Sequence, residues 1–219
     1  MLRFALVVAV CAAAVQTGLH LGGVWLLDGR FASLDAGSDR GIGGSAVVVA
    51  GEIAALGALV ACVRSRNRAD ALRLWFLAAA LGFLGIDRVA ALHDRLAYGL
   101  ADRANLPHAA AWPTLIVYAP LLLPSAWILW FTLPGDVATR TARAGILCLG
   151  CALAILPVAL VVDLVHGSLP NGAIRDVAIA AKEGFALAGW VLVAGALVAT
   201  AGVTAARPAG ATRRPTAPA

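Results

Sequence analysis

Six long apolar runs, separated by short polar segments, dominate the pattern of this chain. They predict helices at about 4–27, 45–63, 72–98, 112–133, 143–166 and 174–205. Each run is long enough to cross a hydrocarbon core of about 30 Å at 1.5 Å per residue. The pattern therefore predicts an all-α bundle of six transmembrane helices, forming a single domain over residues 1–206. Residues 207–219, rich in Ala, Thr, Arg and Pro, are expected to form a disordered cytoplasmic tail.

The composition supports a membrane protein. Hydrophobic residues make up 61% of the chain and charged residues only 13%. A soluble core of 219 residues does not have room for that much apolar surface. The lipid bilayer is therefore the expected partner of the helix surfaces.

The arginines predict the orientation of the bundle, because cytoplasmic loops carry an excess of Lys and Arg. With a cytoplasmic N-terminus, that side holds Arg3, Arg64, Arg66, Arg68, Arg73, Arg140, Arg143, Arg207, Arg213 and Arg214. The other side holds Arg30, Arg40, Arg95, Arg103 and Arg175. This asymmetry favours both termini inside. The topology also explains the net charge of +5, so no nucleic-acid partner is needed.

Ionisable side chains lie inside these apolar runs, where each costs at least a few kcal/mol unless it is paired or lines a wet cavity. All but two of the seventeen Lys and Arg residues lie at or outside the ends of the runs, the exceptions being Arg88 and Lys182. The interior acids and imidazoles are His20, Glu52, Asp87, His93, Asp94, Asp163, His166 and Glu183. A functional site is expected among these residues.

The most specific stretch is Leu84–Leu96 in the third predicted helix, with the sequence LGIDRVAALHDRL. Asp87 and Asp94 are seven residues apart, which places both on one helical face, about two turns apart. Asp87 is expected about 18 Å along the axis from Trp75 at the cytoplasmic boundary, and Asp94 about 10 Å further. One carboxylate then lies just past mid-membrane and the other near the outer rim. Two alternatives stay open: Asp94 lies in a solvated helix end, and Asp87 and Arg88 are a buried neighbouring pair that is neutralised by groups on other helices.

This stretch resembles the third helix of a group of uncharacterised bacterial polytopic membrane proteins that carry a D-E-x4-H-E-R-L pattern. The matching positions are Asp87, His93, Asp94, Arg95 and Leu96. Two positions depart from the pattern: Arg88 replaces its second acid, and Asp94 replaces a Glu. In the last helix, Lys182 and Glu183 stand in place of paired glutamates. The resemblance implies a multi-pass protein of the bacterial inner membrane without an assigned activity.

The other predicted helices place their ionisable residues in the same, outer half of the membrane. His20 lies toward the outer end of the first helix, and Glu52 about a third of the way in from the outer end of the second. Asp163 and His166 lie at the outer end of the fifth. We therefore expect a polar pocket open toward the outer face. Its predicted parts are Glu52, Asp87 and Glu183 as lining, His93 and Asp94 at the mouth, and Arg88 and Lys182 as counter-charges.

Three roles suit this pocket. The first is a buried ion network or an interaction role, in which Arg88 and Lys182 face three deep acids and a shared proton removes the remaining charge. The second is a metal-dependent membrane hydrolase acting on lipid, with a divalent metal bound by Asp87, His93 and Glu183. The third is a proton, ion or small-solute transporter, because carboxylates and imidazoles relay protons.

The first role is favoured. No two intramembrane histidines share a helix at ligand spacing, and the inner half of the predicted bundle carries almost only Ala, Val, Leu and Cys. The sequence assigns no catalytic residue, no protein partner and no oligomeric state.

Overall fold

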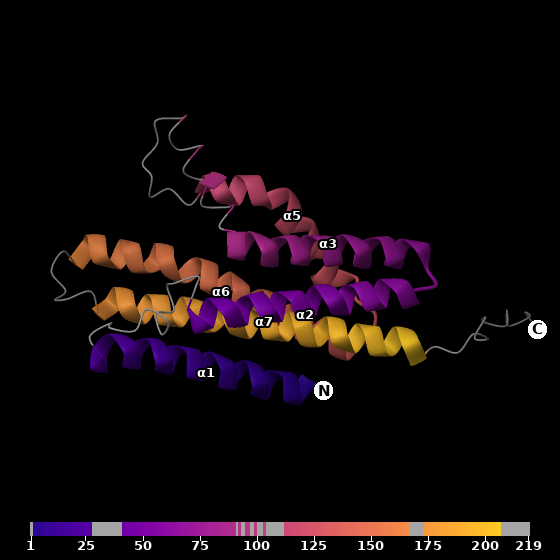
Figure 1. The fold of residues 1–219 in the computed structure, drawn as a ribbon, viewed down its shortest axis with the longest axis horizontal. Coiled ribbons are helices and arrows are strands. Elements are labelled where there is room, and N and C mark those ends of the chain that lie inside the picture. The colour runs from indigo at the N-terminus through magenta and orange to yellow at the C-terminus, as the bar shows by residue number, and fades with distance from the viewer. Residues whose placement is uncertain are drawn as a thin grey trace, which may run out of the picture.

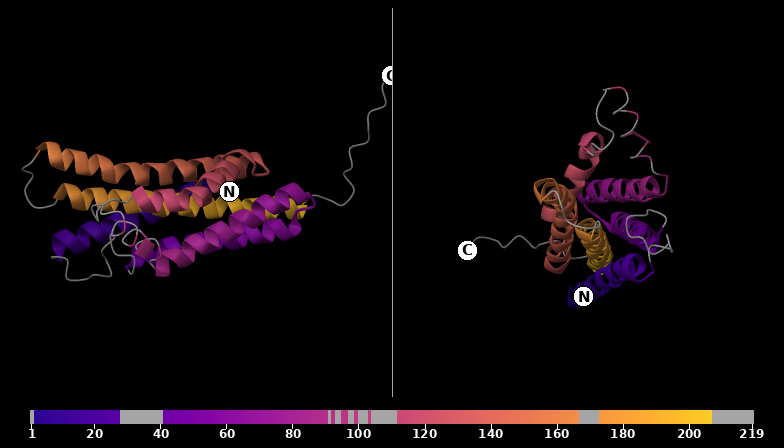
Figure 2. Two further views of the ribbon diagram at one scale, coloured as in Figure 1. Left: turned by 90° about the horizontal axis from the view of Figure 1, so that it is seen from above. Right: turned by 90° about the vertical axis from the view of Figure 1, so that its left-hand side faces the viewer.

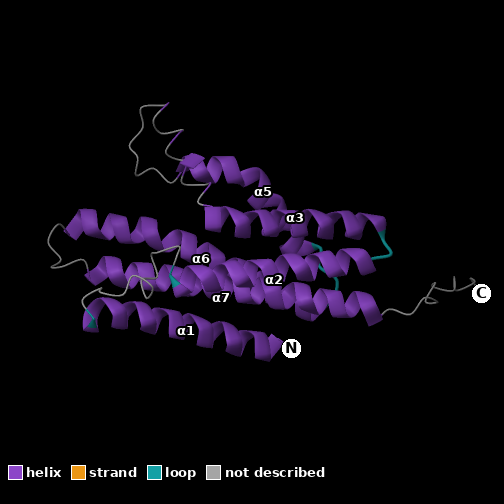
Figure 3. Cartoon of the chain, in the orientation of Figure 1, coloured by secondary structure: helices purple, strands orange, loops and turns teal. Residues whose placement is uncertain are grey.

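The computed structural model describes residues 2–27, 41–90, 92, 95–96, 99, 103, 112–166 and 173–206. Long helices running side by side make up this part of the chain (Figure 1). They are α1 (Leu2–Leu26), α2 (Ile42–Arg64), α3 (Arg68–Ala90), α5 (Trp112–Phe131), α6 (Asp136–His166) and α7 (Ala173–Ala206). Figure 3 shows short loops between the described helices α2 and α3 and between α5 and α6. The expectation of an all-helical chain is confirmed for the described residues.

Among the described helices, five are long and apolar enough to cross a membrane. The exception is α5, whose described apolar part, Tyr118–Phe131, is shorter and contains Pro120 and Pro124. These helices indicate a multi-pass membrane protein. The sixth span and the orientation of the bundle stay predictions, and the predicted tail over 207–219 lies outside the described residues.

Two helices, α3 and α6, begin four or more residues earlier than the hydrophobic pattern predicted. Helix α3 begins at Arg68 instead of about residue 72, because Asn67 Oδ1 accepts a hydrogen bond of 3.0 Å from the Ala69 N–H and caps the first turn. Helix α6 begins at Asp136 instead of about residue 143, directly after Gly135, whose φ is +94°. Both helix starts are polar turns outside the apolar runs, so hydrophobicity alone missed them.

Helix α7 lies at the centre of the bundle. It packs most extensively against α6, α2 and α1, and the end-on view in Figure 2 shows it between these three helices. Helix α3 packs on the other side of α2, so α2 separates α3 from α7. On α2, Ala54, Ala58 and Ala61 are fully buried and form one helical stripe. Such small side chains let helices approach closely in a membrane.

Helices α2 and α7 run in the same direction. Gly51 lies against the Trp190 ring, and further along both helices Gly57 lies against the backbone at Leu197. The start of α1 lies at the same end of the bundle as the end of α7 (Figure 1). This end also holds the α2–α3 and α5–α6 connections, so the arginines near it are Arg3, Arg64, Arg66, Arg68, Arg73, Arg140 and Arg143.

Candidate functional site

Asp87 is buried in α3, with 5% of its surface exposed. The Tyr118 hydroxyl of α5 donates a hydrogen bond of 2.8 Å to its Oδ1 atom. The centroid of the Tyr118 ring also lies 6.1 Å from that of Phe83, one turn before Asp87. A buried acid thus joins α3 to α5, two helices whose other contacts are limited.

Glu52 of α2 directs its carboxylate at Gly85 of α3. A Cβ atom on Gly85 would lie 3.2 Å from Glu52 Cδ and nearer still to Oε1. Glycine therefore provides the space that this carboxylate occupies. Positions 85 and 87 point about 200° apart around a helix, so the Glu52 carboxylate and the Asp87 side chain lie on different sides of α3.

Glu183 of α7 is 3% exposed. Its Oε1 atom lies 2.8 Å from Lys182 Nζ, and the lysine side chain is 33% exposed. The long aliphatic stem of a lysine lets the ammonium stay near a surface while its partner remains buried. The structure thus pairs one of the two interior cations with one of the deep acids.

Polar residues of α1 face this part of α7. Gln16 and His20 are both buried. Thr17 lies between them and donates a hydrogen bond of 3.4 Å to the backbone oxygen of Ala180. A Cβ on Gly184 would lie 2.8 Å from Thr17 Oγ1. The α1–α7 contact therefore places the Thr17 hydroxyl beside the segment of α7 that carries the buried acid, and the buried Gln16 and His20 flank Thr17 on α1.

The described polar residues form two groups, and Glu52, which contacts another side of α3, is separate from both. We call Asp87 and Tyr118 the Asp87 site, and Glu183, Lys182, Gln16, Thr17 and His20 the Glu183 site. Gly51 lies beside Trp190, so the next residue of α2, Glu52, is nearly level with Trp190 on α7. At 1.5 Å per residue, Glu183 therefore lies about 12 Å from Glu52 along the bundle axis. The two sites also lie on opposite sides of α2.

For several predicted site residues, the structure does not describe the side chain. His93 and Asp94 lie outside the described residues. Arg88, Asp163 and His166 belong to described helices, but their side chains are outside the described part. Across the described ranges, no three His, Cys, Asp or Glu residues are grouped so that they could hold a metal ion. The shared pocket and its mouth stay predictions.

Tyr118, Thr17 and Gly85 take part in these contacts and were not among the predicted site residues. A phenol in an apolar run usually finds a hydrogen-bond partner, and this was the signal for Tyr118. Thr17 and Gly85 have no comparable signal. A threonine hydroxyl can bond to its own helix, and glycine is frequent in transmembrane helices.

Comparison with known families places the whole bundle in one group. A family model described as "Domain of unknown function (DUF8692)" matches residues 1–201. No protein with a curated description and no solved structure matches the chain. The match includes every residue of the Asp87 site and the Glu183 site. The chain therefore belongs to the DUF8692 family, a domain of unknown function.

Proposed function

We propose that this protein is a six-span protein of the bacterial inner membrane, with both termini in the cytoplasm, whose deep polar residues hold its helices in register. The observation that carries this proposal is the 2.8 Å hydrogen bond from Tyr118 to the buried Asp87. It links two helices that share few other contacts. An acid at this depth is costly unless it is bonded, so the bond also selects one arrangement of α3 and α5.

The physical need for such a bond is greatest at α5. Lipid tails are as apolar as helix surfaces, so association inside a membrane relies on packing and on hydrogen bonds between helices. Pro120 and Pro124 remove backbone donors from α5 and favour a bend. Because α5 is bent and has little contact area, one directional hydrogen bond, from Tyr118 to Asp87, can fix its orientation against α3.

The Glu183 site has the same role on the other side of the bundle. Helix α1 packs mainly on α7, and Thr17 contacts the α7 backbone beside the paired Lys182 and Glu183. Buried polar pairs contribute more to the choice of packing than to net stability. We infer that this site sets the register of α1 against α7.

A double-mutant cycle tests the proposal. Asp87→Leu and Tyr118→Phe are each expected to lower the free energy of unfolding in detergent by about 1 kcal/mol, with a coupling of about 0.6–1.7 kcal/mol between them. Ser125→Ala is the control, because Ser125 lies on the same helix but donates to its own helix at Leu121 O, 2.7 Å away. It is expected to show no coupling to Asp87→Leu.

Metal analysis and flux measurements separate this role from the two alternatives. Protein that binds stoichiometric zinc, and loses it on Asp87→Ala, would favour the lipid hydrolase over the structural role. A proton flux into liposomes that the same change abolishes would favour the transporter. Protein without bound zinc or flux that loses stability on Asp87→Ala supports the helix-register role.

A further inference from the structure

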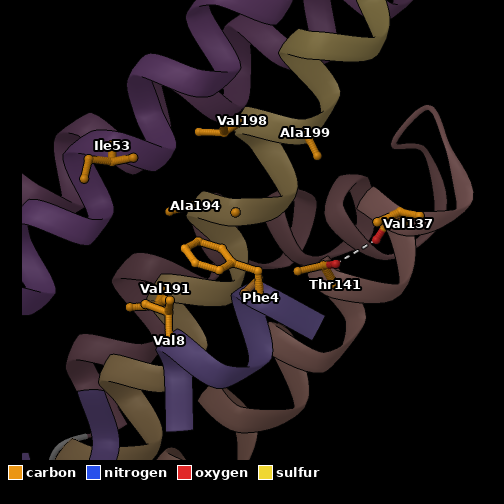
Figure 4. A pocket seen from close by; sticks show the side chains of 11 residues that line it. Phe4, Val8, Ile53, Val137, Thr141, Val191, Ala194, Val198 and Ala199 are labelled. Atoms are coloured by element: carbon orange, nitrogen blue, oxygen red, sulfur yellow. Dashed lines mark hydrogen bonds between the residues drawn. The ribbon is translucent and has the colours of Figure 1, made fainter. Parts of the chain in front are cut away.

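An apolar cavity of about 370 Å³ lies beside α7, toward the end of the bundle where α1 begins (Figure 4). Helix α1 contributes Phe4 and Val8, α2 contributes Ile53, and α6 contributes Val137 and Thr141. The α7 wall consists of Val191, Ala194, Gly195, Val198 and Ala199. All four helices of this half of the bundle therefore border one space.

Small side chains of α7 create this space. Beside this space, helix α1 lies close to α7 at Gly195, where an added Cβ would lie 3.3 Å from the Ala5 Cβ. On either side of that contact, Ala194 and Ala199 leave the gap between the helices unfilled. Thr141 carries the one hydroxyl among the lining side chains, and it donates to Val137 O of its own helix at 2.7 Å. A cavity without polar partners does not hold water stably.

A second cavity of about 620 Å³ adjoins the first, because Val137 and Ala199 line both. Its lining adds two residues of opposite charge, Arg3 and Asp136. It lies at the arginine-rich end of the bundle, beside the start of α6. The apolar chamber thus shares part of its wall with a second cavity that carries one guanidinium and one carboxylate.

We propose that the two adjoining cavities together bind one phospholipid with a zwitterionic ethanolamine headgroup. One acyl chain occupies the apolar chamber, the phosphate lies at Arg3, and the ammonium lies at Asp136. A guanidinium pairs with phosphate oxygens in a bidentate manner. An acyl chain also restores the dispersion contacts that lining atoms forfeit around a void. With the proposed orientation of the bundle, this lipid lies in the cytoplasmic leaflet. The choice of leaflet is the one part of this inference that rests on the proposed function.

The test counts lipids retained by the full chain. The protein is reconstituted with equal amounts of ethanolamine-headgroup and glycerol-headgroup phospholipid, extracted into mild detergent, and analysed by native mass spectrometry. We expect one retained phospholipid, mainly of the ethanolamine type. Ala199→Leu, which fills the junction of the cavities, and Arg3→Gln are both expected to lose it. Asp136→Asn is expected to shift retention toward the anionic glycerol type.

Matched controls separate a bound lipid from lipid that merely surrounds the protein. Ala79→Leu places the same side chain on an exposed position of α3, and Arg140→Gln removes an exposed arginine near the start of α6 that lines neither cavity. Both should retain lipid as the parent does. Equal retention by Ala199→Leu, Arg3→Gln and their controls would overturn the proposal, as would equal retention of the two headgroups by the parent protein. Measurements of helical content and thermal unfolding will check that Arg3→Gln, at an exposed position outside the packed core, remains folded.

Discussion

Gly145 of α6 and Gly189 of α7 bring two helix backbones into direct contact. A Cβ on Gly145 would lie 2.9 Å from the Gly189 carbonyl oxygen, and a Cβ on Gly189 would lie 2.9 Å from the Gly145 carbonyl oxygen. Real Cβ atoms essentially never approach so closely. The most extensive helix contact in the described bundle therefore depends on glycine on both sides.

Substitution at this crossing is expected to destabilise the bundle. Gly189→Ala forces α6 and α7 apart, and overpacking of this kind costs about 1–3 kcal/mol. Gly150→Ala is the matched control on α6, since an added Cβ there meets nothing within 4 Å. The control should be neutral or stabilising by up to about 1 kcal/mol, because alanine restricts the unfolded chain more than glycine does. Unfolding titrations in mixed detergent measure both, and equal effects would contradict the close crossing.

The contact of Glu52 with Gly85 predicts coupling between the two positions. Gly85→Ala places a methyl group where the Glu52 carboxylate lies, so the carboxylate must move and stability should fall by about 1 kcal/mol. In a Glu52→Ala background the space is free, and the same change should cost nothing. Gly82→Ala is the control, since its Cβ would meet only the Ala55 Cβ at 3.9 Å. Additive effects of Gly85→Ala and Glu52→Ala in unfolding titrations would refute the contact.

Lys182 and Glu183 are expected to respond asymmetrically to substitution. Lys182→Leu removes the ammonium that lies 2.8 Å from the buried Glu183 carboxylate, and breaking a buried pair from one side costs about 3–5 kcal/mol. We expect a smaller loss, about 1–3 kcal/mol, because the lysine is one-third exposed and solvent screens the pair.

The double variant Lys182→Leu/Glu183→Leu is the informative comparison. Replacing both members of a buried pair by apolar residues is often neutral or stabilising. A double variant that is more stable than Lys182→Leu alone in thermal unfolding would support a register role. If the double variant is instead the less stable of the two, Glu183 contributes more than its pairing with Lys182.

Site-directed labelling checks the proposed orientation. Asn67→Cys lies in the exposed α2–α3 connection and Leu27→Cys lies at the opposite end, just after α1. With the N-terminus inside, a membrane-impermeant maleimide should label Leu27→Cys in intact cells and Asn67→Cys only after the membrane is opened. The reverse pattern would invert the topology. The background must first lack the native thiols, which are Cys11, Cys62, Cys148 and Cys151.

The helices could be predicted from the sequence because each depends on a local property, the apolar length of one segment. The fourth run, predicted over 112–133, forms α5 over Trp112–Phe131. The sixth, predicted over 174–205, forms α7 over Ala173–Ala206. Apolar length within one segment is sufficient for such predictions. Where polar turns extend a helix, as at the start of α6, the same criterion placed the boundary too late.

The bonding partners of the buried polar residues could not be predicted in this way. Asp87 is conspicuous in the sequence, since an acid in an apolar run must find a bonding partner. Which hydroxyl it meets depends on how α3 and α5 are rotated toward each other, and that partner, Tyr118, lies 31 positions away in the chain. The sequence likewise contains Glu52 and Gly85 without any sign that they touch.

Hydrophobicity along the chain thus determined by itself that this protein is helical and apolar enough for a membrane, because the bilayer acts on each segment separately. The tertiary structure alone decided that α7 is the central helix, that Asp87 and Glu183 lie on opposite sides of α2, and that Arg3 and Asp136 line one cavity. Those relations arise from which faces of distant helices pack together. Glycines and alanines control that packing through the absence of side-chain volume, which leaves no hydrophobic or charged pattern to read.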